Sequence, residues 1–217
     1  MAKIARKRKR ARQDLGVALR TEALHGLIAE LQQLRQYPPL VHKGKGRYEG
    51  DILGFVRGLR LSARIAYFVR DQLNDTKYRT SWGHLLDDAE RSCSPECDVI
   101  IHKKGHVRAW NGYKKSIMNF KFIRANEAVA IISCKSKLNF IDAAYPKGLK
   151  KFGIKHVLLF AETCPEKSFE RLRERAKQAG YQGLWCLYLT GADGSMKSIK
   201  DAIHLDFIKA VKEVTST

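Results

Sequence analysis

Hydrophobic positions along the chain change their spacing near residue 75. Before it, apolar residues recur every three or four positions over residues 14–36 and again over residues 49–73. This is the spacing of one apolar face of an α-helix. Tyr37, Pro38 and Pro39 stand between the two segments, and proline ends a helix because it lacks the backbone N–H. The first third of the chain is therefore predicted to form two helices.

Beyond residue 75 the apolar runs are short and alternate with longer amphipathic segments. Strands are predicted over residues 82–86, 97–102, 129–134, 156–161 and 184–190, and helices over residues 141–151, 166–179 and 198–214. Strands that alternate with helices indicate a largely parallel sheet covered by helices, and the first two strands form a hairpin-like pair. The predicted fold class is α/β, with a mixed sheet flanked by helices.

The length of 217 residues and the hydrophobic content of 44% are enough for one domain with a small helical appendage. We expect a basic arm over residues 1–13, an N-terminal helix over residues 14–40 and an α/β domain over residues 41–217. No apolar run approaches the roughly 18–20 residues of a membrane span. The cysteine count is five, and the N-terminus lacks the apolar core of a secretory signal, so we expect reduced thiols and a cytoplasmic location.

Positive charge is concentrated in two blocks of the chain. The formal net charge is +19, and residues 1–12 and 103–124 each hold seven Lys or Arg and no acid. The remaining residues therefore carry only +5. Nucleic acid is the commonest partner of such basic segments. The alternatives are an anionic membrane or a solubilising surface, a solvated or localisation role for the arm, and, for the second block, a hairpin whose aromatic residues face the core.

Thirteen basic residues are predicted to contact nucleic acid. Three of them, spaced three and four residues apart, would line one stripe of the second helix. The set is Lys7, Arg8, Lys9, Arg10, Arg57, Arg60, Arg64, Lys103, Lys104, Arg108, Lys114, Lys115 and Lys137. The second block also interleaves aromatic residues, which can stack on unpaired bases.

Two charged residues stand at predicted apolar strands. Asp98 opens the strand at residues 97–102, and Lys135 closes the strand at residues 129–134. A charge beside a buried strand is costly unless it is paired or functional. On neighbouring strands, the carboxylate could hold a divalent cation and the ammonium could orient a water and stabilise charge on a phosphate. The alternative is a structural salt bridge between the two.

These residues resemble the motif of the PD-(D/E)xK, or restriction-endonuclease-like, nuclease superfamily. The resemblance extends over about residues 42–190 and is closest to an uncharacterised bacterial branch with a Ser-Pro-x-x-Asp strand and a Glu-x-Lys-Ser strand. Here these are residues 94–98, ending in Asp98, and residues 133–136, containing Lys135. The resemblance implies that Asp98 binds Mg²⁺, that Lys135 assists the attacking water, and that Glu49 is an accessory acid from the preceding helix. It also implies a bacterial or phage source.

The chain departs from this motif at Ser133, which occupies the position of the glutamate. A neutral hydroxyl is a weak ligand for a hard dication, so metal affinity should fall. Glu96 and Glu49 are the two residues that could supply the missing carboxylate. We therefore expect a nucleic-acid-binding protein, with DNA as its partner, on a nuclease-like core. It is either a Mg²⁺-dependent endonuclease with a degenerate site or a non-catalytic DNA- or RNA-binding protein that retains the fold.

Overall fold

The computed structural model describes residues 47–73, 77–89, 92–104, 108–109, 120–199 and 201–216, with side chains from Gly58 onward except at 108–109, 120 and 201–203. The expected basic arm and first helix lie outside these residues. By internal packing the chain divides into Met1–Asp51 and Ile52–Thr217. Only the first residues of helix α2 (Arg47–Leu73) are described for the first unit.

The second unit contains a mixed sheet with four helices packed on it. The described strands are β1 (Tyr78–Leu86), β2 (Cys97–Lys103), β3 (Arg108–Ala109), β4 (Phe120–Arg124), β5 (Ala128–Lys137), β6 (His156–Pro165), β7 (Leu184–Thr190) and β8 (Met196–Ser198). They lie in the order β3-β4-β1-β2-β5-β6-β7-β8. The helices besides α2 are α3 (Ala144–Lys150), α4 (Phe169–Ala179) and α5 (Asp201–Ser216). None of the described helices is long and apolar enough to cross a membrane.

The sheet confirms the predicted α/β class. Strands β5, β6 and β7 are parallel, as the alternation of strands and helices predicts, whereas β2 runs antiparallel to both β1 and β5. Strand β5 has ten residues and continues past its predicted end. Lys135 therefore lies inside β5, and the expectation that it closes the strand was wrong. The strand can continue because Lys135 and Lys137 are exposed and pay no desolvation cost.

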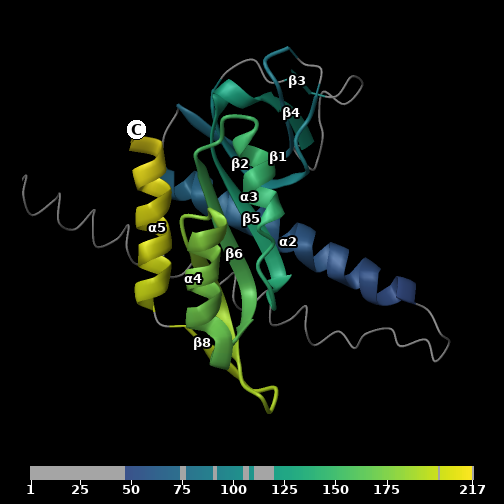
Figure 1. Cartoon of the computed structure of the whole chain (residues 1–217), viewed down its shortest axis with the longest axis vertical. Helices are drawn as coiled ribbons and strands as arrows, with labels where there is room; N and C mark the ends of the chain where they lie inside the picture. The colour runs from purple at the N-terminus through teal and green to yellow at the C-terminus, as the bar shows by residue number, and fades with distance from the viewer. Residues whose placement is uncertain are drawn as a thin grey trace, which may run out of the picture. The chain divides into compact units, whose positions relative to one another are not determined.

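The helices cover both faces of the sheet (Figure 1). On one face, Phe207 of α5 packs against Phe68 of α2, Phe160 of β6 and Trp185 of β7, with ring centroids 4.9–6.4 Å apart. On the other face, α3 and α4 contribute buried residues to a core cluster that includes Leu159 of β6. A strand that is covered on both sides needs apolar residues at successive positions, which explains the continuous apolar runs of β5 to β7.

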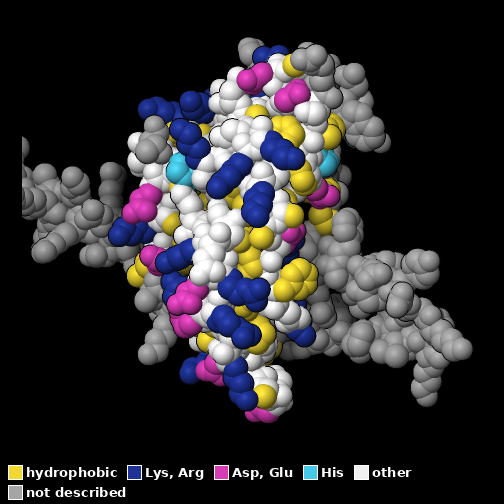
Figure 2. Space-filling model, in the orientation of Figure 1, with side chains coloured by type: hydrophobic (Ala, Val, Ile, Leu, Met, Phe, Trp, Pro, Cys, Tyr) yellow, Lys and Arg dark blue, Asp and Glu magenta, His cyan; other side chains and the backbone are white. Residues whose placement is uncertain are grey.

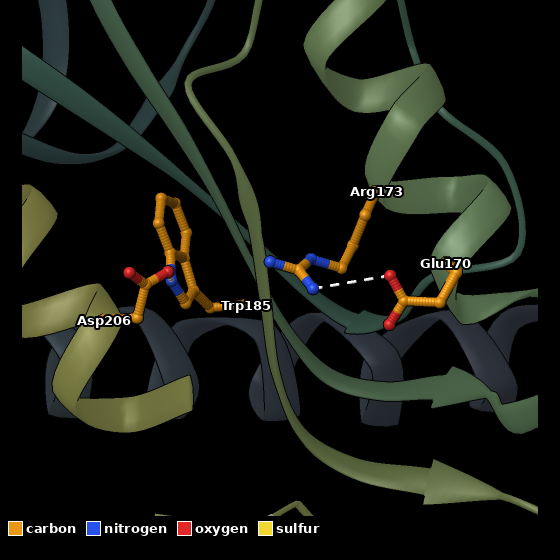
Figure 3. A network of polar contacts seen from close by, with 4 residues as sticks. All are labelled: Glu170, Arg173, Trp185 and Asp206. Carbon is orange, nitrogen blue, oxygen red and sulfur yellow. Dashed lines mark hydrogen bonds and ion pairs between the residues drawn. The ribbon is translucent and has the colours of Figure 1, made fainter. Parts of the chain in front are cut away.

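A polar pair fixes α5 against the sheet. The Trp185 indole N–H donates to Asp206 Oδ2 at 3.1 Å, and Figure 3 shows the two side chains side by side. A buried indole needs such a partner because its N–H would otherwise be unsatisfied. On α4, Arg173 pairs with Glu170 one turn away at 3.4 Å. That exposed pair contributes little to stability.

The basic block of residues 103–124 contains paired antiparallel strands, as the hairpin alternative for this block predicted. Strand β3 pairs antiparallel with β4, and β4 continues the sheet beside β1. The half-buried Phe122 stacks on His84 of β1, with ring centroids 5.7 Å apart. Gly83 lets the two strands approach, because its φ is +146° and a Cβ there would collide with the Lys121 carbonyl oxygen. Residues 110–119 lie outside the described part.

Candidate active site

A β-bulge presents Asp98 at the junction of β1, β2 and β5. Ser81 pairs with Ile100, but Gly83 pairs with Cys97, so two residues of β2 face the single residue Trp82 of β1. Bulges of this kind re-aim a side chain and are frequent beside functional sites. On the other side of β2, Val99 pairs with Ile132, which places Asp98 opposite Ser133. The two sequence motifs therefore meet.

The Asp98 carboxylate is held by the backbone of β5. Its Oδ2 accepts the Cys134 N–H at 2.8 Å and the Ser133 hydroxyl at a longer 3.5 Å. Burial raises the pKa of Asp98, while the Cys134 N–H and the charge of Lys135 oppose that rise and the charge of Glu96 adds to it. Asp98 is thus a carboxyl group whose ionised form is costly unless a further positive group arrives.

Lys135 lies two residues beyond Ser133 on the same strand, and its side chain is exposed. Its charge acts on Asp98, but no ion pair joins the two residues in the described part of the chain. The salt-bridge interpretation of this pair is therefore wrong. An exposed ammonium beside a half-buried carboxylate leaves the cation available to a ligand.

Glu96 is the second carboxylate near the site. Its Oε1 accepts the Trp82 indole N–H at 2.5 Å, and its negative charge is one cause of the raised pKa of Asp98. The Glu96 side chain is exposed, and its carbonyl oxygen accepts the Tyr145 hydroxyl at 3.2 Å. Glu49 lies in α2, but its side chain is outside the described ones.

The residues at this junction could supply only a few ligands to Mg²⁺. Ser133 is 1% exposed and neutral, and no group of three or more His, Cys, Asp or Glu converges among the described residues. Mg²⁺ is nevertheless commonly bound by one or two carboxylates, with waters and substrate phosphates completing its shell. Asp98 and Glu96 match that mode in the number of carboxylates, although one oxygen of each already accepts a hydrogen bond from the protein. They do not make a cage from the protein alone.

Two tyrosines border Asp98, and sequence reasoning missed both. Burial raises the pKa of Tyr145, and the charges of Cys97 and Asp98 raise it further. Burial likewise raises the pKa of Tyr181, and Asp142 and Asp98 add to it. Both hydroxyls are therefore protonated at neutral pH. The signal that could have found them is weak, since each is a single aromatic residue far from the motif in sequence.

The predicted nucleic-acid contacts fall into three groups. Those with exposed side chains are Arg60, Arg64, Lys103, Lys104 and Lys137. Those whose side chains are not described are Arg57 and Arg108, and those wholly outside the described residues are Lys7, Arg8, Lys9, Arg10, Lys114 and Lys115. Sequence reasoning missed a further gathering of Lys and Arg over α3 and α4, which Figure 2 shows. It includes the exposed Lys147, Lys150, Arg171, Arg175 and Lys177.

Comparison with known proteins supports the fold and not the motif. No protein-family model and no curated protein matches the chain. Among solved structures, two have a similar fold over most of the chain. The chain is similar to NucC of P. aeruginosa ATCC27853 in its cAAA-bound form, with a TM-score of 0.57, 13% identity, 91% of this chain covered and 90% of that one. NucC of E. coli MS115-1, also cAAA-bound, has a TM-score of 0.56 at 10% identity, with the same coverage of 91% and 90%.

Proposed function

We propose that this chain binds nucleic acid, with DNA as the expected partner, through a nuclease-like core in which Asp98, Ser133 and Lys135 form a reduced hydrolytic site. The observation that carries the proposal is the bond from Asp98 to the β5 backbone at Cys134, one residue before the exposed Lys135, whose charge acts on Asp98 without an ion pair. The nuclease-type fold supports it. An exposed cation at this junction suits a phosphate oxygen.

The distribution of charge supports a polyanion as the ligand. Lys137 ends β5 two residues beyond Lys135, on the Asp98 side of the junction. Lys103 ends β2 at the opposite end of this antiparallel pair, so the cations lie at both ends of the two strands. Each phosphate contact releases condensed counterions from the nucleic acid, which makes such binding strong at low salt. The acid-free arm at residues 1–12 adds cations to the same chain. Binding of nucleic acid through phosphate contacts therefore does not depend on a carboxylate at position 133.

A second candidate function is Mg²⁺-dependent hydrolysis of the phosphodiester. Asp98 and Glu96 would hold the ion, which would supply charge stabilisation and a more acidic bound water. Lys135 would orient the phosphate and oppose the charge that develops on it. The bulge that aims Asp98 at Ser133 favours this candidate, since bulges beside active sites serve that purpose.

One experiment separates the two candidates. Plasmid and single-stranded DNA are incubated with Mg²⁺ or Mn²⁺ and with wild type, Asp98→Ala, Lys135→Ala or Ser133→Glu, and both binding and cleavage are measured. Binding without cleavage in wild type, weakened in Lys135→Ala, supports the reduced site. Cleavage by wild type that is lost in Asp98→Ala and Lys135→Ala establishes the second candidate. Absence of binding in all four proteins would overturn the proposal.

A further inference from the structure

Helix α2 leaves a hollow where it crosses β1, beside Asp98. At this crossing its residues include Ser62, Ala63 and Ala66, whose short side chains do not fill the space. The result is a cavity of about 210 Å³, with Asp98 in its wall. This volume is below the roughly 300–1,000 Å³ of pockets for drug-sized ligands. It suits one flat ring system and is too small for a base pair.

Two aromatic residues stand in the wall of this cavity. Tyr67 of α2 is 61% exposed, and Trp82 of β1 is half-buried. The guanidinium carbon of Arg70 lies 4.4 Å from the centroid of the Tyr67 ring, so the tyrosine already carries a cation on one side. A large exposed aromatic side chain beside a hollow offers a stacking surface to a planar ligand.

The two serine hydroxyls of the wall can only accept hydrogen bonds from a ligand. The Ser62 hydroxyl donates its proton to the Gly58 carbonyl at 2.9 Å. The His102 Nδ1–H must donate to the Lys103 carbonyl at 2.7 Å, so His102 Nε2 is an acceptor and takes the Ser81 hydroxyl proton at 2.9 Å. Asp98 adds a carboxylate. Arg70 and the Tyr67 hydroxyl supply donors in the same wall, but beside Asp98 and the two serines the wall offers acceptors, which favour a ligand edge that carries N–H donors.

We propose that this cavity binds one unpaired nucleobase of the strand held at the Asp98–Lys135 site, and that it prefers bases with an exocyclic amino group. The inference rests on the proposed function for the strand, but the base pocket is argued from its own walls. Cytosine presents an amino donor where uracil presents a carbonyl acceptor. Against Asp98 and the two serines, cytosine therefore gains a hydrogen bond where uracil places two acceptors together.

The surface next to the cavity suits the phosphates that flank such a base. Arg60 and Arg64 are exposed on α2, one turn apart, and Ala63 and Tyr67 lie on the same exposed side of the helix. A strand that follows these arginines would pass the mouth of the cavity. Unpaired or damaged positions should bind best, because extracting a paired base from a duplex costs a few kcal/mol.

The direct test uses free nucleosides, so that it does not depend on strand binding or cleavage. Cytidine and uridine are titrated into the full chain, and binding is followed by saturation-transfer NMR and by tryptophan fluorescence. Ala66→Leu fills the cavity, Tyr67→Ala removes the exposed stacking surface without touching the core, and Ala144→Leu on the exposed side of α3 is the matched control. Thermal melts establish that each variant is folded.

The expected result is that cytidine binds roughly tenfold more tightly than uridine to wild type and to Ala144→Leu. Ala66→Leu and Tyr67→Ala should each lose about tenfold in cytidine affinity. Equal binding of the two nucleosides, or cytidine binding that both cavity variants retain, would overturn the inference.

A second titration separates this inference from the proposed function. Single-stranded oligonucleotides that either contain cytosine or have an abasic site at one central position are bound to the same proteins. Strand binding that is equal with and without the base overturns the pocket and leaves the proposed function standing. If the protein binds cytidine but no strand, the pocket stands and the proposed function is overturned. If removing the base weakens strand binding to wild type but not to Ala66→Leu, the result supports both the pocket and the proposed function.

Discussion

The Asp98 carboxylate on β2 accepts the backbone N–H of Cys134 on β5 at 2.8 Å. This bond locks the aspartate across the two strands and engages one of its oxygens with the protein itself. The residue just before Cys134 is Ser133, where the resembling nucleases carry a glutamate. The junction therefore places one carboxylate opposite a serine, and Lys135 is exposed two residues farther along β5.

A second carboxylate opposite Asp98 should create metal binding. Ser133→Glu places a second acid opposite the half-buried Asp98, and two neighbouring acids without a cation repel each other. We expect a lower melting temperature than wild type in EDTA and a clear rise on adding Mg²⁺, measured by calorimetry. Ser133→Gln is the control of equal size without charge. Equal stabilisation of both variants by Mg²⁺ would show that the carboxylate at position 133 does not bind the ion.

Removing the charge of Asp98 should stabilise the fold. Burial raises the pKa of Asp98, so the ionised carboxylate is unfavourable in the native state, and Glu96 adds repulsion. Asp98→Asn keeps an oxygen for the Cys134 N–H and should gain about 1 kcal/mol, or roughly 2–4 °C in melting temperature. The exposed Asp88→Asn is the control. A melting temperature lower than wild type would show that Asp98 contributes to stability as a charge.

His102 should make stability fall on mild acidification. Its pKa is lowered by burial first and by the charges of Lys121 and Arg79. The unfolded chain therefore takes up the proton near pH 6.5 before the native state does, and stability falls as pH decreases below that value. Its contribution to the slope is at most about 1.4 kcal/mol per pH unit.

Urea unfolding of wild type and His102→Gln between pH 5 and pH 8 measures this contribution. The stability difference between the two proteins should be constant above pH 7 and should shrink below pH 6.5, because only wild type loses stability there by protonation of this ring. A difference that stays constant over the whole range contradicts the assignment of a neutral His102.

Gly83 should tolerate no side chain, unlike other glycines with positive φ. Alanine at Gly83 would meet the Lys121 carbonyl oxygen, which belongs to the backbone of β4 and cannot move away alone. Gly153 has a φ of +76° and open space around it, so Gly153→Ala carries the conformational strain without the collision. We expect Gly83→Ala to cost more than 2 kcal/mol, and Gly153→Ala about 1 kcal/mol, in chemical unfolding. Equal losses would place β4 farther from β1 than the structure does.

The sequence predicts the positions of the central strands because they are buried on both faces, but β5 and β6 continue three and four residues past their predicted ends. Strand β7 has the predicted bounds, and the helix predicted from residue 166 appears as a short 3-10 turn followed by α4. Strand β1 begins four residues earlier than predicted, since Arg79, Thr80 and Ser81 pair with β2 without an apolar pattern. The exposed β8 has no apolar residue pattern and was not predicted.

Some features of the candidate site could likewise be predicted from the sequence, and others could not. The meeting of Asp98 and Ser133 follows from strands and motif, and the sequence could predict it. The bond between Glu96 and Trp82 depends on the bulge in β2, and the hollow beneath α2 depends on how closely a helix with short side chains approaches β1. Such distances are set by tertiary packing, which residue spacing does not encode.

The salt dependence of DNA affinity tests the central claim most directly. Dissociation constants are measured by fluorescence anisotropy at several salt concentrations for wild type, Lys135→Ala/Lys137→Ala and the control Lys209→Ala/Lys212→Ala on α5. The account predicts that the first pair flattens the slope of log affinity against log salt by about 2, at roughly 0.9 per duplex phosphate contact, and that the control leaves it unchanged. Equal slopes for all three proteins would contradict binding at the Asp98–Lys135 junction.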